Sequence, residues 1–291
     1  MTFDYTKKIT NPVDFPRNPS SEQEIREDMQ NMFDEIKDAH NDLDTIVKTH
    51  LADIAILNFG FNNAGFHNSI YRGKFLGNQV SAAQWLEIEA GTFKDMFIGD
   101  YWTIDNIDWV ICAFDYYMTT GSSYKVTDHH VTLMPRGRLY GHKMNNSNTT
   151  DGGYLGSLMY EEGLDEAKIT IKAAFNNRIL KHEQYLTNGY DEAGITASVW
   201  IDSEVELCNE VMVFGTQAYG SHIFSSGRAV GVCKSQLPVF TLRPDFANIG
   251  THWWLRDPIS GTFFARVHGG GTAGANSAFS ALDVRPAFSI S

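Results

Sequence analysis

The sequence predicts an α+β protein in which a long helix precedes a domain of short strands. From about residue 21 to residue 51 there is no glycine or proline, and the apolar residues follow a helical period. Later, short β-like runs alternate with two helical patterns and long loops, which does not fit a doubly wound sheet. The chain has 291 residues, enough for one large domain with an appendage. We expect an extended arm over residues 1–20, a helix over 21–51, a connector over 52–80 and a domain over 81–291.

The expected arm carries three prolines, Pro12, Pro16 and Pro19. Proline disrupts helices and lacks the amide donor that a central strand needs. Closely spaced prolines favour an open arm that lies against another surface. A disordered tail is the alternative.

The expected helix begins with a capping box formed by Ser21 and Glu24, and acidic residues crowd its first turn, where the helix dipole favours them. Apolar residues then recur at alternating spacings of four and three, which is the a/d pattern of a coiled coil. The residues expected to form this oligomerising seam are Ile25, Met29, Met32, Ile36, Leu43 and Ile46, with Ala39 at the remaining position.

We expect the helix to form a homo-oligomer, and a trimer because symmetric fibres commonly contain three chains. The seam is short, and its mixture of Ile, Met, Leu and Ala specifies the number of chains weakly. The alternative is an amphipathic helix that packs on its own domain. Phe33 and Val47 favour this alternative because they widen the apolar stripe.

The rest of the chain predicts short elements. Residues 52–80 are rich in Gly and Asn, as in a connector or an irregular first strand, and Ser81 then caps a short helix that Gly91 ends. We expect strands at 100–104, 108–117 and 129–135 with a turn at Asp105-Asn106, helices at 164–176 and 203–213, and final strands at 251–258, 261–270 and 281–290.

Composition argues against several kinds of partner. The formal net charge of −12 disfavours nucleic acids and anionic membrane surfaces, because both attract clustered Lys and Arg. The chain shows no signal peptide and no run of about 18 apolar residues, so we expect cytosolic synthesis and no membrane insertion. Cys112, Cys208 and Cys233 are too scattered for a disulfide framework, and we interpret them as buried thiols.

Few patterns indicate catalysis or metal binding. His129 and His130 are neighbours on a predicted strand, so they point to opposite faces and are expected to be structural. Residues 145–153 are rich in oxygen ligands but lack the acidic spacing of a calcium loop. The sequence contains no G-x-S-x-G motif and no P-loop. We therefore expect no metal, no cofactor and no enzymatic activity.

Four residues near the C-terminus, Trp253, Trp254, Arg256 and Arg285, are expected to hold the domain together. Adjacent strand positions face opposite sides, so we expect one tryptophan in the core and the other at a rim. Arg285 is expected to form a fixed ion pair with a carboxylate such as Asp257.

The runs GDYWTIDNIDWVICAFDYY, WWLRDP and DVRPAFSI, in this order, resemble an uncharacterised domain family of phages and gut bacteria over roughly residues 90–291. That family is similar to the C-type-lectin-like fold shared by formylglycine-generating enzymes and phage tropism determinants. The stretch KITNPVDFPRNPSSEQEIREDMQNMFDEI resembles the virion-attachment N-termini of phage structural proteins. These resemblances imply a C-type-lectin-like domain on a virion-attached arm and helix.

In tropism determinants of this fold, the segment between the Trp-containing strand and the last strand contacts the ligand, which corresponds to residues 262–281 here. Its glycines allow tight turns, and it is poor in large aliphatic residues. A hairpin loop that binds nothing is the alternative. The chain lacks the E-P-N, Q-P-D and W-N-D motifs of calcium-dependent lectins and the cysteine pair of formylglycine-type enzymes. The residues expected to bind a ligand are Phe264, Arg266, His268, Thr272, Asn276, Ser277 and Phe279.

The resulting hypothesis is a phage virion protein, such as a tail fibre, tail tip or head fibre, made in the host cytoplasm. Its arm would attach to other virion proteins, and its C-terminal domain would bind a glycan or protein on the host cell surface. The alternative is a purely structural capsid or tail decoration protein without a host ligand, and an enzyme is the third possibility. A large apolar face at the last loops would favour decoration, and a cleft with two converging carboxylates would favour an enzyme.

Overall fold

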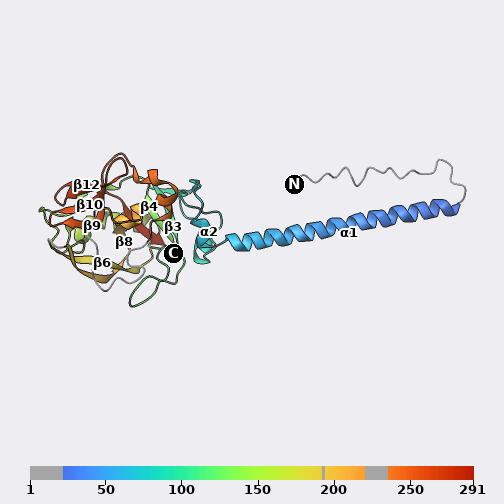
Figure 1. The fold of residues 1–291 in the computed structure, drawn as a ribbon, viewed down its shortest axis with the longest axis horizontal. Coiled ribbons are helices and arrows are strands. Elements are labelled where there is room, and N and C mark those ends of the chain that lie inside the picture. The colour runs from blue at the N-terminus through green and yellow to red at the C-terminus, as the bar shows by residue number, and fades with distance from the viewer. Residues whose placement is uncertain (1–21, 192–193, 220–234) are drawn as a thin grey trace. The chain divides into compact units, whose positions relative to one another are not determined.

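The computed structural model describes residues 22–191, 194–219 and 235–291 of the chain (Figure 1). The chain divides into two units with a boundary between Gly60 and Phe61. The expected arm over residues 1–20 and the capping residue Ser21 lie outside the described residues.

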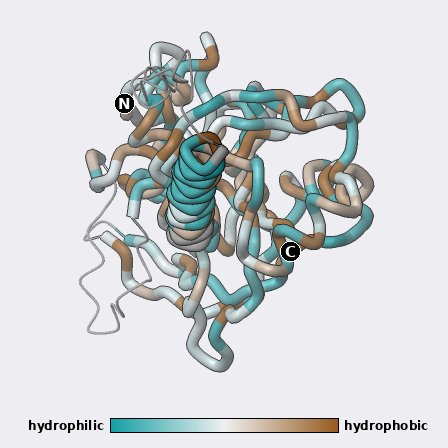
Figure 2. Tube along the Cα trace, turned by 90° about the vertical axis from the view of Figure 1, so that its right-hand side faces the viewer, coloured by the Kyte–Doolittle hydropathy of each residue, from teal (hydrophilic) through white to brown (hydrophobic). Residues whose placement is uncertain are grey.

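The described part of the first unit is the 40-residue helix α1 (Glu22–Phe61), whose last residue lies just past the boundary. The helix is longer than expected, because it continues through the first ten residues of the expected connector. Much of α1 is teal in Figure 2, in keeping with a helix whose apolar residues are interspersed among charged ones. No described helix is both long and apolar enough to span a membrane. The apolar side chains with the largest exposed fractions on α1 are Ile25, Met29, Phe33, Ile36, Leu43, Ile46, Val47, Leu51 and Ile54, at 39% to 60%.

The second unit contains two larger sheets and a hairpin. The first sheet has the strand order β1-β2-β3-β4-β13-β8, in which β1 and β2 are parallel and the other pairs are antiparallel. Its strands are β1 (Phe75–Gly77), β2 (Tyr101–Ile104), β3 (Ile107–Phe114), β4 (Val131–Pro135), β13 (Pro286–Ile290) and β8 (Val205–Leu207).

The second sheet has the order β11-β10-β9-β12-β5. Its strands are β11 (Ala273–Ser277), β10 (Phe263–Val267), β9 (Trp253–Ser260), β12 (Ala281–Val284) and β5 (Tyr140–Lys143), and the separate hairpin is β6 (His182–Asp191) with β7 (Gly194–Ser203). The consecutive strands β12 and β13 belong to different sheets, so the chain passes from one sheet to the other at Arg285. The mixed α+β class is therefore confirmed.

The helices of the second unit are short. They are α2 (Ala64–His67), α3 (Ala82–Glu89), the π-helix η1 (Met159–Gly163), α4 (Asp165–Ala174), α5 (Glu210–Phe214), α6 (Pro238–Leu242) and the 3₁₀ helix η2 (Pro244–Ala247). The predicted cap of α3 is confirmed, because Ser81 and Gln84 form a complete capping box. The predicted helix at 164–176 is confirmed as α4, which buries Ala167 and Ile171.

The prediction of one helix over residues 203–213 is wrong for the first half of this range. Val205 and Leu207 are two residues apart and both buried, and β8 pairs with β13 over these positions. Asn209 then starts the separate helix α5, because its side chain accepts a hydrogen bond from the Met212 amide. Strand pairing therefore prevails over the helical pattern until this cap.

The body of the protein begins before the expected residue 81. His67 is buried and its Nδ1 lies 2.5 Å from the Met96 carbonyl oxygen. The side chain of Asn68 bonds to both the amide and the carbonyl of Phe114. Because β1 also joins the first sheet, residues 61–80 belong to the folded body and not to a connector.

Trp253 and Trp254 are both fully buried, so the expectation that one lies at a rim is wrong. Their side chains do point to opposite sides of β9, as neighbouring strand positions must. Trp253 packs in the larger core and Trp254 in a second, smaller core that includes Tyr154 and Phe264. Both faces of the sheet are covered at this point, which buries both tryptophans.

Candidate ligand-binding groove

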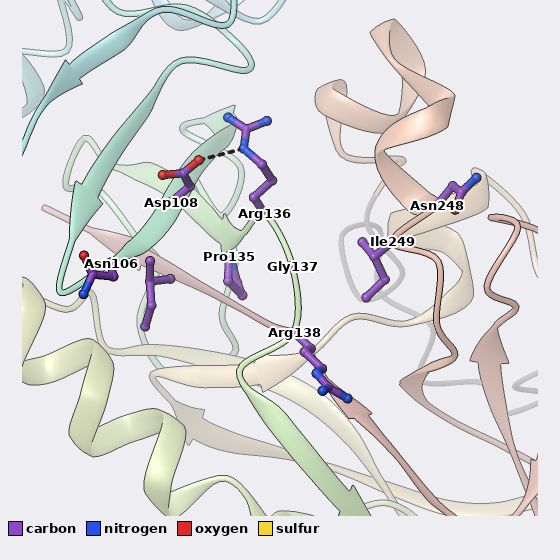
Figure 3. A pocket seen from close by; sticks show the side chains of 9 residues that line it. Asn106, Asp108, Pro135, Arg136, Gly137, Arg138, Asn248 and Ile249 are labelled. Atoms are coloured by element: carbon purple, nitrogen blue, oxygen red, sulfur yellow. Dashed lines mark hydrogen bonds and ion pairs between the residues drawn. The ribbon is translucent and has the colours of Figure 1, made fainter.

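An open groove of about 570 Å³ lies where three loops of the body meet. It is lined by residues 106–108 of the β2–β3 hairpin, residues 135–138 after β4 and residues 248–249 after η2. Its volume lies in the range of pockets that hold small ligands. In Figure 3, Asn106, Asp108 and Arg136 lie on one side of the groove, and Asn248 and Ile249 lie on the other.

The first wall is a two-residue hairpin turn. Asp105 and Asn106 have φ angles of 51° and 61°, and Ile104 pairs with Ile107. Positive φ at both central residues defines a type I′ turn, which suits the twist of the flanking strands. Asp and Asn adopt this left-handed backbone more readily than other non-glycine residues. The predicted turn is confirmed, and it brings Asn106 to the edge of the groove.

Two arginines of the β4–β5 loop stand beside this wall. Arg136 Nε donates to Asp108 Oδ2 at 3.0 Å, and the Arg136 guanidinium lies 4.6 Å from the ring centroid of Tyr101. Arg138 Nη1 pairs with Asp283 Oδ1 at 3.1 Å. The two arginine side chains are 44% and 62% exposed. They are therefore oriented by their partners and still accessible to a ligand.

The opposite wall is fixed by hydrogen bonds around Asn248. Asn248 Oδ1 accepts from the Gly250 amide at 3.0 Å, an arrangement typical of an Asx turn. Trp253 Nε1 donates to the Ala247 carbonyl at 3.0 Å, and the Gly250 amide also donates to the Gly269 carbonyl at 3.2 Å. This wall is thus attached to the core and to the β10–β11 loop.

Arg285 connects the two walls from inside the core. Its Nε donates to the Pro135 carbonyl at 3.0 Å, and its Nη1 donates to the Phe246 carbonyl at 2.9 Å. The guanidinium also lies over the rings of Phe246 and Trp253, at 4.2 Å and 5.0 Å from their centroids. The antiparallel register of β13 with β4 brings Arg285 beside Pro135. The expected ion pair with Asp257 is therefore wrong.

Arg285 is a fully buried cation that no carboxylate of the described residues pairs with. Burial lowers the pKa of Arg285 to about 10, and the positive charge of Arg136 acts in the same direction. The guanidinium is still protonated at neutral pH. Its Nη2 is buried and makes no hydrogen bond to the described residues. An uncompensated buried charge is unfavourable, and it contributes a positive potential to its surroundings.

The segment expected to bind a ligand consists mainly of the hairpin β10–β11. The stretch over β11 was expected to be a loop, but it pairs with β10 over five residues. Phe264 is fully buried in the second core, which removes it from the expected ligand-binding set. Arg266 is partly buried and donates from Nε to the Ala275 carbonyl at 2.9 Å. Of the other expected residues, His268, Thr272 and Phe279 are exposed, and Asn276 and Ser277 are partly exposed.

The tip of this hairpin adjoins the groove wall. The rings of His252 and His268 lie 4.6 Å apart. The Gly269 amide donates to His252 Nδ1 at 2.8 Å, and the Gly270 amide donates to His268 Nδ1 at 3.1 Å. Burial lowers the pKa of His252, the charges of Arg266 and His268 lower it further, and Asp283 opposes them. The tip of the β10–β11 hairpin therefore lies beside the groove, but the rest of the segment that was expected to bind a ligand does not line it.

Two carboxylates with raised pKa values, Glu206 and Asp257, lie elsewhere in the body. Glu206 accepts hydrogen bonds from Tyr154 at 2.7 Å and from Ser203 at 2.8 Å, and burial raises its pKa. Asp257 accepts from the Glu210 amide at 2.6 Å. Burial and then the charge of Glu210 raise the pKa of Asp257 to about 7. Since both carboxylates are satisfied by groups of the core, we interpret them as parts of its packing.

His129 and His130 directly precede β4 and are not part of the strand on which they were predicted to lie. His130 is fully buried, the His129 side chain is 40% exposed, and their Nδ1 atoms lie 3.9 Å and 2.8 Å, respectively, from the two carboxylate oxygens of Asp115. In the described part of the chain, no three His, Cys, Asp or Glu side chains are grouped so that they could hold a metal ion. Cys112 and Cys208 are buried free thiols, as predicted, and Cys233 lies outside the described residues.

The groove was not predicted from the sequence. Two arginines flank a glycine directly after a predicted strand, and this was a usable signal for a polar loop. Asn106 lies in a turn that was predicted. Asn248 is far from both in the sequence, however, and no pattern linked it to them.

Comparison with known proteins places this α+β body, with its open polar groove, in a family. The family model described as "Domain of unknown function (DUF6273)" matches residues 94–291, and the chain belongs to this family. The matched region includes the Arg136–Arg138 loop, Asn248 and Arg285. No curated protein and no solved structure matches the chain.

Proposed function

We propose that the protein is a phage virion component that assembles through α1 and binds a host-surface ligand through the groove of its body. The body would have a C-type-lectin-like fold, as the resemblance of its sequence runs implies. The arm over residues 1–20 would attach the protein to other virion proteins. In this proposal the protein acts by recognition and has no catalytic role.

The observation that carries the proposal is the groove with its fixed walls and unused donors. Asn248 uses Oδ1 within its own loop, and its Nδ2 makes no hydrogen bond to the described residues. The Asn106 amide and the two terminal nitrogens of Arg136 likewise make no hydrogen bond in the described part of the chain. Polar groups that are oriented by the scaffold and free to bond are typical of ligand sites.

The apolar stripe of α1 supports the assembly part of the proposal. Ile36 is 57% exposed and Leu43 is 49% exposed within the single chain. A second and third copy of the helix would bury such residues, at about 25 cal/mol per Å² of apolar surface. Oligomers increase weak surface binding, because several sites act at a high effective concentration.

A purely structural decoration protein is the second candidate. Phe263 and Phe279 are 40% and 52% exposed near the ends of the β10–β11 hairpin. Exposed aromatic residues of this kind would suit contact with a neighbouring virion protein. Lys143 Nζ covers the Phe279 ring at 4.3 Å, however, so less of this surface is apolar than the phenylalanines alone indicate.

The test is binding of the fluorescently labelled full chain to a panel of intact bacteria with different surface polysaccharides. The groove variant combines Asn106→Ala with Asn248→Asp, which keeps the oxygen that accepts from Gly250 but removes the amide donor. The matched control combines Asn146→Ala with Asn148→Asp in another exposed polar loop, where Asn148 Oδ1 accepts from Ser277.

The proposal predicts binding to at least one strain, a loss of roughly tenfold or more in the groove variant, and no change in the control. Absence of binding to every strain, or binding that the groove variant leaves unchanged, would contradict it and favour the decoration role.

A further inference from the structure

The net charge of the residues that line the groove is positive, whereas the net charge of the whole protein is negative. The chain has a formal net charge of −12, so most of its surface repels anions. Three arginines lie at the groove, two on its rim and Arg285 behind both walls. Among the described residues that line the groove, Asp108 is the carboxylate, and Asp283 pairs with Arg138 from outside this lining. The groove is therefore a locally positive site on an acidic protein.

The free hydrogen-bonding groups at the rim are mainly donors. Arg136 uses only Nε for Asp108, and Arg138 uses only Nη1 for Asp283. The remaining guanidinium nitrogens make no hydrogen bond to the described residues. The same holds for Asn248 Nδ2, while Asn248 Oδ1 is occupied by Gly250. A ligand that satisfies these groups must be rich in acceptor oxygens.

The shape of the groove sets a second condition. Ile107, Pro135 and Ile249 supply apolar surface between the polar groups. The open form and the volume of about 570 Å³ suit a flat ligand that extends beyond the groove. A sugar ring has apolar C–H faces and a polar edge, and a carboxylate on the ring matches the planar fork of an arginine.

We propose that the groove binds an acidic glycan, whose carboxylate and hydroxyl oxygens accept hydrogen bonds from Arg136 and Arg138 at the two ends of the loop and whose ring packs on Ile107 and Ile249 (Figure 3). This inference rests on the proposed host-binding function and names its ligand class. Arg285 acts as a positioning residue, because it holds both walls through the Pro135 and Phe246 carbonyls and adds its charge from within the core.

The test is calorimetric titration of the full chain with matched pairs of oligosaccharides that differ in one carboxylate. The probes are sialyllactose against lactose and cellobiouronic acid against cellobiose. The variants are Arg136→Gln and Arg138→Gln. The control is Arg243→Gln, because Arg243 also pairs with an aspartate, Asp245, and lies over a tyrosine ring at 4.7 Å, yet is outside the groove.

We expect at least one acidic sugar to bind about tenfold more tightly than its neutral partner. Each groove variant should weaken this binding by roughly 5- to 20-fold, and the control should not. Because rim charges are screened by salt, the affinity for the acidic sugar should fall between 50 and 300 mM NaCl more than that for any neutral sugar.

The outcomes separate the inference from the function on which it rests. Equal affinity for acidic and neutral sugars, or no sugar binding by a chain that does bind bacterial cells, would overturn the acidic-glycan inference alone. Failure to bind any cell would instead overturn the proposed function.

Discussion

Arg285 Nε donates to the carbonyl oxygen of Pro135 at 3.0 Å, although 150 positions separate the two residues in the sequence. The same guanidinium donates to Phe246 from its other side. One buried side chain thereby fixes the distance between two loops that form opposite walls of the groove. Substitutions at Arg285 should consequently affect both stability and the groove.

We predict that Arg285→Met and Arg285→Lys each lower the free energy of unfolding by about 2–4 kcal/mol, because neither side chain can satisfy both carbonyls. Urea denaturation at pH 7 measures the change. Arg138→Gln is the control, because loss of this exposed ion pair should lower the free energy of unfolding by less than about 1 kcal/mol. Midpoints equal to that of the natural protein in both Arg285 variants would contradict the bridging role.

The second prediction concerns Asp257, whose pKa burial raises to about 7. Above the unfolded pKa, the unfolded chain releases this proton while the folded protein retains it, so Asp257 lowers stability as the pH rises from about 4 to 7. Asp257→Asn should therefore stabilise the protein more at pH 8 than at pH 4.5, by about 2–4 kcal/mol. Urea titrations at both pH values measure the difference.

The control for Asp257 is Asp245→Asn, because the hydrogen bond from Arg243 lowers the pKa of Asp245. A carboxyl group with a lowered pKa stabilises the folded state at pH values above its pKa in the unfolded chain. Asp245→Asn should therefore lower the free energy of unfolding at pH 8, whereas Asp257→Asn should raise it. The difference in free energy of unfolding between Asp257→Asn and the natural protein should change between pH 4.5 and pH 8. If this difference is the same at both pH values, ionisation of Asp257 does not destabilise the fold.

The third prediction concerns the hairpin tip. His252 Nδ1 accepts from the Gly269 amide, so a protonated His252 loses this hydrogen bond. Because the pKa of His252 is lowered, its neutral form stabilises the fold above pH 6.5, and this contribution is lost as the pH falls below that value. We expect the Gly269 amide to exchange with deuterium faster, relative to the protein average, at pH 5 than at pH 7.5.

The variant His252→Gln keeps an acceptor but does not titrate near neutral pH. In this variant the intrinsic-rate-corrected exchange at Gly269 should depend less on pH. If the natural protein and the variant show the same pH dependence, His252 does not control the tip.

These residues also show what the sequence can predict. The Asp105-Asn106 turn and the Ser81 cap were predictable, because each depends on neighbouring residues. The burial of both Trp253 and Trp254 was not, because it requires a second core on the far face of β9, formed partly by Tyr154 and Phe264. The carbonyl partners of Arg285 likewise depend on the crossing of the chain between two sheets.

The fourth prediction is that α1 assembles several copies of the chain. Ile36→Asp with Leu43→Asp should convert the oligomer to a monomer at micromolar concentration, because charges in a helix seam disfavour association. Sedimentation velocity measures the state, and Asp38→Ser on another face of the helix is the control. A natural protein that sediments as a monomer would show that the exposed stripe of α1 does not join copies of the chain.

The most direct test of the binding role is a hydrogen–deuterium exchange footprint of the full chain. The probe is surface polysaccharide extracted from a bacterial strain that the labelled protein binds. If the groove binds the polysaccharide, exchange should slow in the groove walls, at residues 104–108, 135–139 and 246–251. Protection confined to residues 273–280, or no protection at saturating polysaccharide, would contradict the assignment of the groove as the ligand site.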